Sequence, residues 1–353
     1  MKRNLLFVCF VPGLALMATV WLTACETPAK GGPGGGIFDD SETYVPPEKL
    51  PIVDVYERLA AAETAADRTT LLEVVSITPE GQVSTVPISP AEVQMLMEAV
   101  PKEAAQDDPD TGSEPIGPRA EATEPGAREL GGTESFDPET VIGTDTRTRV
   151  NNTTSYPFRT VGRIDIGCTG TLIGPRHVLT AGHCVYNIQT DKWYSQLRVS
   201  PGQNGSTLPY GRIDWARAIS VKGWTASHRR DYDYAMIVLK QNIGNTVGWM
   251  GYGYDNNLPM YNVNINGYPG DKPSGTMWHS FCKLSIIQTY RLYYPCDTYG
   301  GMSGSAVYVY LANQNKRIIY GIHAYGVDPT GLNGATRINK AVFENLKKWK
   351  ATY

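Results

Sequence analysis

Residues 180–184 (TAGHC) and residues 301–305 (GMSGS) are the most informative stretches of this chain of 353 residues. The first contains His183, and the second contains Ser303 between glycines. Asp233 lies between them in the sequence, just before an apolar run. An imidazole accepts the proton of a serine hydroxyl, and a carboxylate holds that imidazole in the productive orientation. The order His, Asp, Ser therefore predicts a nucleophilic serine site.

The residues around Ser303 also suit the oxyanion that such a reaction forms. The backbone N–H groups of Gly301 and Ser303 are the candidate donors, and a glycine at 301 lets the peptide turn toward the substrate. The stretch lacks the last glycine of the nucleophile elbow of α/β-hydrolases, which argues against that class. This chemistry predicts no metal ion and no cofactor.

From about residue 140 onward, the chain has the pattern of an all-β protein. Short runs of strand character lie at residues 160–166, 196–200, 236–240, 263–267, 306–310 and 318–323. The remaining length predicts one domain of two β-barrels over residues 140–353. A final helix is predicted at residues 339–349, with Asn339 as its N-cap. Its apolar face consists of Val342, Leu346 and Trp349.

The chain begins like an exported protein. Lys2 and Arg3 precede a mostly apolar stretch that ends just before Cys25. The pattern predicts a signal peptide over residues 1–24, and the residues before Cys25 resemble the bacterial lipobox, in which that cysteine is lipidated. An ordinary signal peptide with an incidental cysteine is the alternative. In both cases the protein leaves the cytoplasm, as a lipoprotein of the cell envelope or as a secreted protein after propeptide cleavage.

Residues 25–139 are interpreted as a flexible tether and an acidic propeptide. Residues 30–36 (KGGPGGG) are too poor in side chains to build a core. Two helical patterns follow, near residues 53–66 and 90–100. Residues 106–138 are acidic and rich in Pro and Gly, which is typical of a disordered connector open to cleavage.

Charge separates this region from the rest of the chain. Residues 26–139 contain 24 acidic and 7 basic residues, whereas residues 140–353 contain 11 acidic and 23 basic residues. The opposite excesses predict that the propeptide docks on the domain as an intramolecular partner, or else that the acidic segment is simply solvated. The expected partners are protein or peptide substrates, with no nucleic acid, and with membrane contact only through a lipid anchor.

Four cysteines of the exported domain have the opportunity to oxidise. Three pairings are possible. Cys184 follows the candidate base and Cys168 lies on the preceding strand, so a Cys168–Cys184 bond would hold the histidine loop to the sheet. That choice leaves Cys282 with Cys296. Their spacing does not resemble that of a zinc site.

Together, these motifs resemble the bacterial glutamyl endopeptidases, a chymotrypsin-like branch of the serine proteases. The resemblance rests on residues 141–145 (VIGTD), 147–149 (RTR), 180–186 (TAGHCVY), 220–225 (SVKGWT) and 297–300 (DTYG). It implies the two-barrel chymotrypsin-like fold and endopeptidase activity through an acyl-enzyme. It also favours Asp233 over its rival Asp231, because the matching family position precedes the apolar strand by two residues.

The resemblance leaves two specificities open. His323 matches the family's pocket histidine, and with Thr298 it would bind a glutamate side chain, or an aspartate less well. A core histidine satisfied by the backbone is the plainer interpretation of His323. Asp297 lies six residues before Ser303, where trypsin keeps the carboxylate that binds lysine and arginine, so a trypsin-like preference is the alternative. A binding module that kept the fold and lost catalysis is a third possibility.

Two further positions bear on activation and on the pocket wall. Met302 stands where trypsin-like zymogens carry an aspartate that binds the new amino terminus after cleavage. That aspartate is absent here. The resemblance places the mature start at Thr140 or Val141, and Glu139 would let a glutamate-specific enzyme cut its own precursor, although another protease is the alternative. Gly301 and Gly270 occupy places where related Bacillus enzymes carry a disulfide.

Overall fold

The computed structural model describes residues 64–97, 102–105, 140–328 and 330–353. All of them belong to one unit, Glu48–Tyr353. The predicted signal peptide, Cys25, the tether and the acidic connector lie outside the described residues. No helix in the described part of the chain is long and apolar enough to span a membrane.

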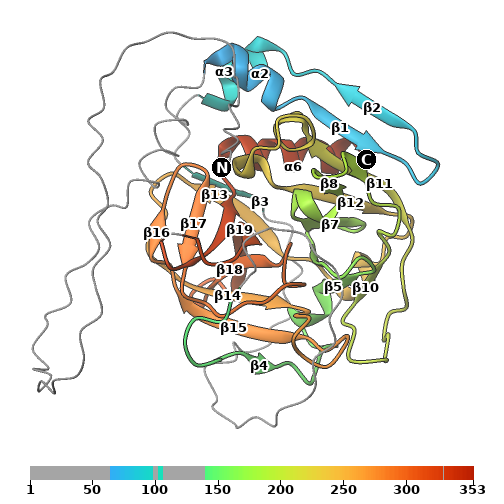
Figure 1. Ribbon diagram of the computed structural model, residues 1–353, viewed down its shortest axis with the longest axis vertical. Coiled ribbons are helices and arrows are strands. Elements are labelled where there is room, and N and C mark those ends of the chain that lie inside the picture. The colour runs from blue at the N-terminus through green and yellow to red at the C-terminus, as the bar shows by residue number, and fades with distance from the viewer. Residues whose placement is uncertain (1–63, 98–101, 106–139, 329) are drawn as a thin grey trace, which may run out of the picture. The chain divides into compact units, whose positions relative to one another are not determined.

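Two large sheets contain most of the strands (Figure 1), which confirms the prediction of an all-β, two-barrel fold. The first is antiparallel throughout. In spatial order, its strands are β10 (Val199–Pro201), β5 (Val161–Ile164), β6 (Thr169–Leu172), β7 (His177–Thr180), β12 (Ala235–Leu239), β11 (Trp215–Val221), β1 (Val74–Ile77) and β2 (Val83–Val86). The central strands β6, β7 and β12 are buried on both faces, which explains why their sequences show little alternation.

The second sheet contains the remaining long strands. Its main path runs through β16 (Ile286–Ile287), β17 (Arg291–Tyr294), β20 (Asn333–Arg337), β19 (Lys316–Tyr325), β18 (Ala306–Leu311), β14 (Asn262–Gly267), β15 (Trp278–Lys283) and β4 (Thr148–Arg149). Off this path, β13 (Gly251–Asp255) pairs in parallel with β19 and antiparallel with β3 (Lys102–Ala105). A small separate ribbon pairs β8 (Tyr186–Asn187) with β9 (Lys192–Trp193).

Helices are short, apart from the one at the C-terminus. They are α2 (Ala65–Leu71), α3 (Pro90–Met97), α4 (Lys222–Thr225), α5 (Gly244–Val247) and α6 (Lys340–Thr352), with 3-10 turns η1 (Phe158–Thr160), η2 (Gly182–Cys184) and η3 (Arg230–Tyr232). The N-cap of α6 is Asn339, as predicted, because its side chain accepts the N–H of Val342 at 3.1 Å. The predicted apolar face is buried, and Trp349 stacks on Tyr234 with 5.7 Å between ring centroids. This stacking fixes α6 to the chain just before β12.

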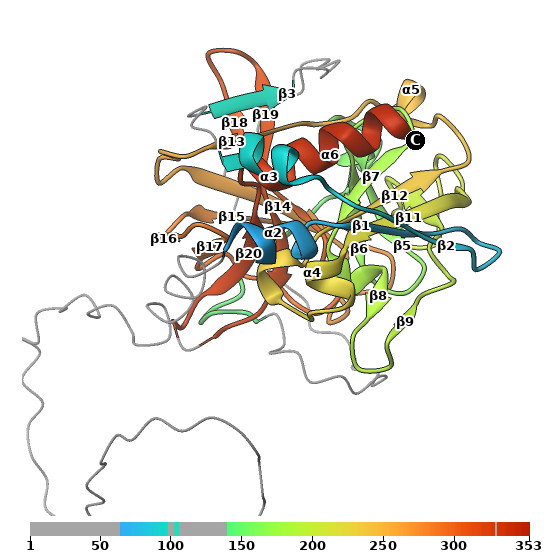
Figure 2. The ribbon, with the colours of Figure 1, turned by 90° about the horizontal axis from the view of Figure 1, so that it is seen from above.

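The N-terminal segment, defined here as residues 64–97 and 102–105, contributes strands to both sheets. Strand β1 extends the first sheet beside β11, and β3 pairs with β13 of the second (Figures 1 and 2). The predicted helix near residues 90–100 is present as α3. Only the end of the pattern at residues 53–66 is described, where α2 begins at Ala65. The segment therefore pairs with strands of both sheets, which the sequence patterns did not predict. That this segment belongs to a propeptide stays a prediction.

Both predicted disulfides are present. Cys168 bonds to Cys184 and Cys282 bonds to Cys296. The first joins the strand entry of β6 to the histidine turn η2. The second ties β15 to the chain that follows β17.

We predict that Asn339→Ala lowers the free energy of unfolding by about 1 kcal/mol, because the helix loses the side-chain acceptor at its N-terminus. Denaturant unfolding of the purified protein measures the change. Asn245→Ala, in the short helix α5 where it caps nothing, is the comparison and is expected to change stability less. Equal losses for the two variants would contradict the capping role.

Candidate active site

The imidazole of His183 faces the carboxylate of Asp233. The distance from His183 Nδ1 to Asp233 Oδ2 is 2.7 Å, and the backbone N–H of His183 donates to Asp233 Oδ1 at 2.8 Å. Strand register explains the meeting. Ala235 of β12 pairs with Thr180 of β7, so the turn that leaves β7 and the residues that enter β12 lie at the same end of the first sheet. The sequence prediction of Asp233 as the partner of His183 agrees with this geometry.

The Asp233 carboxylate is fully buried, yet it is provided with several donors. Burial alone would raise the pKa of Asp233, but the facing His183 and hydrogen bonds from His183 and Tyr325 together lower it. Tyr325 donates its hydroxyl to Asp233 Oδ2 at 2.7 Å. Two guanidinium groups flank the Tyr325 ring, Arg230 at 4.4 Å and Arg291 at 4.8 Å from its centroid. A carboxylate held in this way stays charged and keeps the imidazole oriented.

Ser303 lies against the same turn, although it comes from the second sheet. Its carbonyl oxygen accepts the N–H of Thr169 at 2.8 Å and lies 3.5 Å from the sulfur of Cys184, the neighbour of His183. The next residue, Gly304, donates its N–H to the carbonyl of His323 at 2.7 Å. The loop between β17 and β18 is thus attached to both sheets, and it brings Ser303 to the histidine turn.

Two glycines of this loop are required by its shape. Gly301 has φ +102°, and a Cβ there would lie 2.5 Å from the carbonyl oxygen of Tyr268. Gly304 has φ +85°, and a Cβ there would lie 2.2 Å from Thr169 O. The carbonyl oxygen of Gly301 accepts the hydroxyl of Thr169 at 2.8 Å. This hydrogen bond fixes the orientation of the Gly301 backbone, which only a glycine adopts readily.

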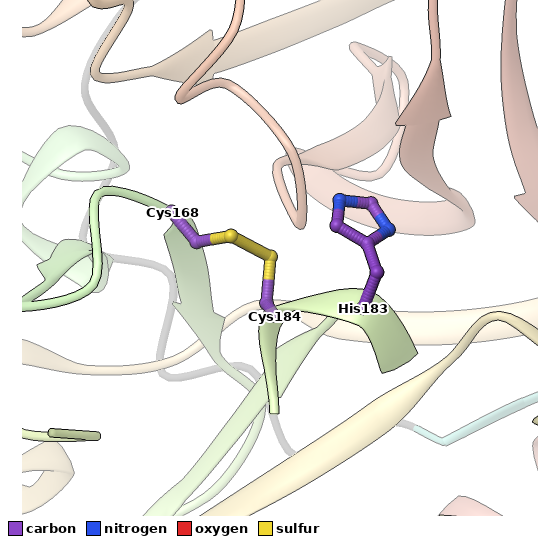
Figure 3. Close-up of side chains that lie close together, drawn as sticks. All are labelled: Cys168, His183 and Cys184. Atoms are coloured by element: carbon purple, nitrogen blue, oxygen red, sulfur yellow. A yellow bond between two sulfur atoms is a disulfide. The ribbon is translucent and has the colours of Figure 1, made fainter. Parts of the chain in front are cut away.

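The disulfide and the imidazole project from the same short turn (Figure 3). The side-chain nitrogen of His183 and the sulfurs of Cys168 and Cys184 lie within 4.8 Å of one another. Such a cluster would suit a soft metal ion if the sulfurs were thiolates. Here both sulfurs are joined in a disulfide, so they are not available as thiolate ligands, and the bond instead holds the histidine turn to β6.

The two other candidate aspartates have different roles. Asp231 accepts hydrogen bonds from Arg229 and Arg291, each at 3.1 Å, and therefore belongs to an ion-pair group behind the site. Asp297 is buried and accepts the backbone N–H groups of Ile142 and Thr146, each at 2.8 Å. Its carboxylate fastens the start of the domain. The reading of Asp297 as a pocket anion for lysine or arginine is not supported by this geometry.

One of the two predicted pocket residues, Thr298, lies next to this start, and the other, His323, lies on β19. Thr298 donates its backbone N–H to the carbonyl of Thr140 at 3.3 Å, and its buried hydroxyl has no hydrogen-bond partner among the described residues. His323 is also fully buried, and its Nδ1 lies 2.6 Å from the hydroxyl of Tyr294. Burial and the nearby His183 lower the pKa of His323 to about 3, although a hydrogen bond with the Gly334 backbone raises it. The imidazole of His323 is therefore neutral near pH 7.

Gly270 and Gly301 lie next to each other. A Cβ on Gly301 would lie 3.3 Å from Gly270 N, and that N–H donates to the carbonyl of Gly300 at 2.7 Å. A backbone hydrogen bond therefore connects the two loops. The Cys282–Cys296 bond reinforces the same wall one residue before Asp297.

Comparison with known proteins agrees with this geometry. The trypsin family model matches residues 145–289. A glutamyl endopeptidase of Bacillus licheniformis is 44% identical over 220 residues, which span 60% of this chain and 69% of that protein. The chain belongs to the glutamyl endopeptidase family.

Two further relatives extend this assignment to the family. A Bacillus subtilis protein named extracellular metalloprotease is 40% identical over 227 residues, 61% of this chain and 71% of that protein. A solved structure of a Glu endopeptidase superimposes with a TM-score of 0.55 and 35% identity, over 60% of this chain and all of that one. The present chain is therefore a serine endopeptidase with the trypsin fold, as its motifs predicted.

Tyr325 is the site residue that the sequence reading missed. It follows two residues after His323 at the end of β19, where a tyrosine in a buried strand is ordinarily a core residue. A bulge between His323 and Tyr325 changes the register with β20. A tyrosine two residues after the predicted pocket histidine was the available signal, but only the fold shows that its hydroxyl reaches Asp233.

We predict that Tyr325→Phe lowers kcat about tenfold or more and leaves KM nearly unchanged. The variant keeps the ring between the two arginines and removes one donor to a buried carboxylate, a hydrogen bond of about 1.5–3 kcal/mol. Steady-state kinetics on a peptide substrate measure the split. Tyr308→Phe, which removes a buried hydroxyl bonded to Asn266, is the matched control and is expected to keep kcat. A kcat for Tyr325→Phe equal to that of the control would exclude the positioning role.

Proposed function

We propose that this endopeptidase is exported and hydrolyses peptide bonds after glutamate, and less readily after aspartate, through an acyl-enzyme. The observation that carries the proposal is the 2.7 Å contact between His183 and buried Asp233 beside the Ser303 loop. Order, spacing and geometry then point to the same three residues.

In the proposed mechanism, His183 is the general base and Ser303 is the nucleophile. His183 takes the proton of the Ser303 hydroxyl as its oxygen attacks the substrate carbonyl carbon, and then returns the proton to the leaving amine. Water then attacks the acyl-enzyme while His183 takes its proton, and His183 returns that proton to Ser303 as the acid product is released. Asp233 stays charged throughout and stabilises the imidazolium, consistent with its lowered pKa.

The oxyanion is proposed to bind to the backbone N–H groups of Gly301 and Ser303. The positive φ of Gly301 turns its peptide, and the Thr169 hydroxyl holds the carbonyl of the same residue. Donors fixed before the reaction stabilise the developing charge without reorganising. The backbone hydrogen bond at Gly270 supports this arrangement.

Glutamate specificity is proposed to arise from His323 and Thr298. A substrate carboxylate beside His323 would raise the imidazole pKa from about 3 and offset the burial that lowers it. It would also give the Thr298 hydroxyl a partner. The excess of basic residues in the domain favours acidic substrates, and the engagement of Asp297 with residues 142 and 146 argues against a preference for arginine.

Activation is proposed to follow cleavage between Glu139 and Thr140, by the enzyme itself or by another protease. The backbone of Thr140 already contacts the pocket side, where its N–H donates to Asn333 Oδ1 at 3.2 Å. Cleavage there would place a new amino group beside the side chain of Asn333, in the residue whose carbonyl accepts the N–H of Thr298. Export follows from the predicted signal peptide, and Cys25 is the proposed lipidation site.

We predict that the enzyme cut before Thr140 cleaves a peptide with glutamate before the scissile bond in preference to the same peptide with arginine. Ser303→Ala is expected to lower kcat at least about 10⁴-fold. Paired peptides that differ in this one residue measure the preference. Faster cleavage after arginine would overturn the glutamate assignment and leave the serine mechanism in place.

We predict that His323→Gln lowers kcat/KM for the glutamate peptide about 10- to 100-fold, the equivalent of one lost charge-assisted hydrogen bond. His279→Gln is the matched control, because His279 is a buried histidine of the same sheet that bonds to Asn266. Kinetics on glutamate and glutamine peptides check the result. Loss of activity on both peptides in equal measure would point to a structural role for His323.

A further inference from the structure

The N-terminal segment is bound as part of a sheet. Strand β1 pairs antiparallel with β11 over residues 74–77 and 218–221, and β2 covers its other side. The backbone N–H of Lys222 continues the ladder by donating to the carbonyl of Glu73 at 2.9 Å. Strand β3 adds a second ladder, along residues 252–255 of β13. The segment thus uses strand addition, in which backbone hydrogen bonds hold an extended chain on a sheet edge.

Apolar side chains of the segment belong to the core of the domain. Leu72, Val74 and Val93 are buried in the same cluster as Ala218 and Val342. Val93 is 1% exposed although it lies on the short helix α3, because α3 packs on the start of α6 (Figure 2). Removal of the segment would therefore expose apolar surface on both partners.

Opposite charges connect the same two surfaces. Glu73 pairs with Lys222 at 2.6 Å and Glu92 pairs with Lys348 at 2.8 Å. Hydrogen bonds from Lys348 and Ser89 lower the Glu92 pKa to about 2, so this carboxylate is charged near pH 7. These two pairs join acidic residues of the N-terminal segment to basic residues of the domain.

All of these contacts come from residues 72–93 and 102–105, and the predicted connector at residues 106–138 follows them in the sequence. We propose that, after the chain is cut in this stretch, the N-terminal segment stays bound as a strand-donating subunit of the mature enzyme. The proposal rests on the processing proposed above and goes further, because a removed propeptide ordinarily leaves. The partner of the β11 edge is the chain's own cleaved segment.

The bound segment also supports the active site from behind. Strand β11 leads directly into α4 and η3, and the chain then reaches Asp233. Trp224 of α4 lies 6.3 Å from His183 between ring centroids. Because Glu73 holds Lys222 through both backbone and side chain, the segment fixes the beginning of the loop that ends at Asp233.

The test uses the full exported chain carrying Ser303→Ala, which is unable to cut itself. Brief trypsin treatment cuts the connector, where Arg119 and Arg128 are available. Size-exclusion chromatography in native buffer, followed by intact mass analysis, then asks whether the two fragments elute together. We expect co-elution in native buffer and separation in urea. Separation in native buffer, with the domain still folded, would overturn the proposal.

A matched pair of variants locates the contact. Val74→Asp puts a charge into the buried face of β1 and is expected to weaken retention at least tenfold. Val83→Asp makes the same change on β2, where the residue is 57% exposed, and is expected to retain the fragment. Release by both variants, or by neither, would contradict the assigned interface. If Val74→Asp fails to fold, the trypsin-treated chain that carries Ser303→Ala alone still decides whether the two fragments stay together.

This result is separable from the proposed specificity. Trypsin makes the cut, so an enzyme that prefers arginine would still show whether the fragments stay together. Conversely, fragments that separate would leave the glutamate assignment untouched.

Discussion

The site depends on one buried charge. Asp233 is completely buried, and an ion in such a place is tolerated only when donors surround it. Leaving a buried charge without its partners costs about 3–5 kcal/mol, a large share of the stability of a domain. His183 supplies two donors and Tyr325 a third. These contacts offset the free-energy cost of burying the carboxylate, and they also orient the imidazole. Stability and chemistry here rest on the same hydrogen bonds.

The two sheets meet around that charge through side-chain bonds to backbone. The hydroxyl of Thr336 in the second sheet donates to the carbonyl of Asp233 at 2.9 Å. In the other direction, Thr169 of the first sheet holds both Gly301 and Ser303 by their carbonyls. Because each sheet fastens a loop of the other, the base and the nucleophile keep their relative position although more than a hundred residues separate them.

The sequence predicted the parts of this site that are local, and missed those that depend on pairing at a distance. His183, Asp233 and Ser303 stand beside short motifs with a recognisable chemistry, and Asn339 follows the local rules of helix capping. Tyr325 was missed because the partner of a hydroxyl is decided by strand register. Asp297 was open to two interpretations for the same reason, since its backbone partners lie some 150 residues away.

The N-terminal segment shows another limit of sequence reasoning. Its helical pattern near residue 90 was found, but β1 and β2 were not, because Val74–Ile77 is four residues long and is buried by β11. Charge asymmetry left docking and solvation of the acidic residues both open, and it did not predict the strand pairing of β1 with β11. A short strand that pairs with a strand far away in the sequence shows little periodicity of its own.

Strand β2 changes what the first sheet presents to its surroundings. Without the segment, the sheet would end at β11, a seven-residue strand that is largely buried, and such an open edge recruits strands from other molecules. With it, the sheet ends at four exposed residues that include Ser84 and Thr85, next to a turn. The segment therefore replaces a seven-residue, largely buried edge strand with an edge strand of four exposed residues.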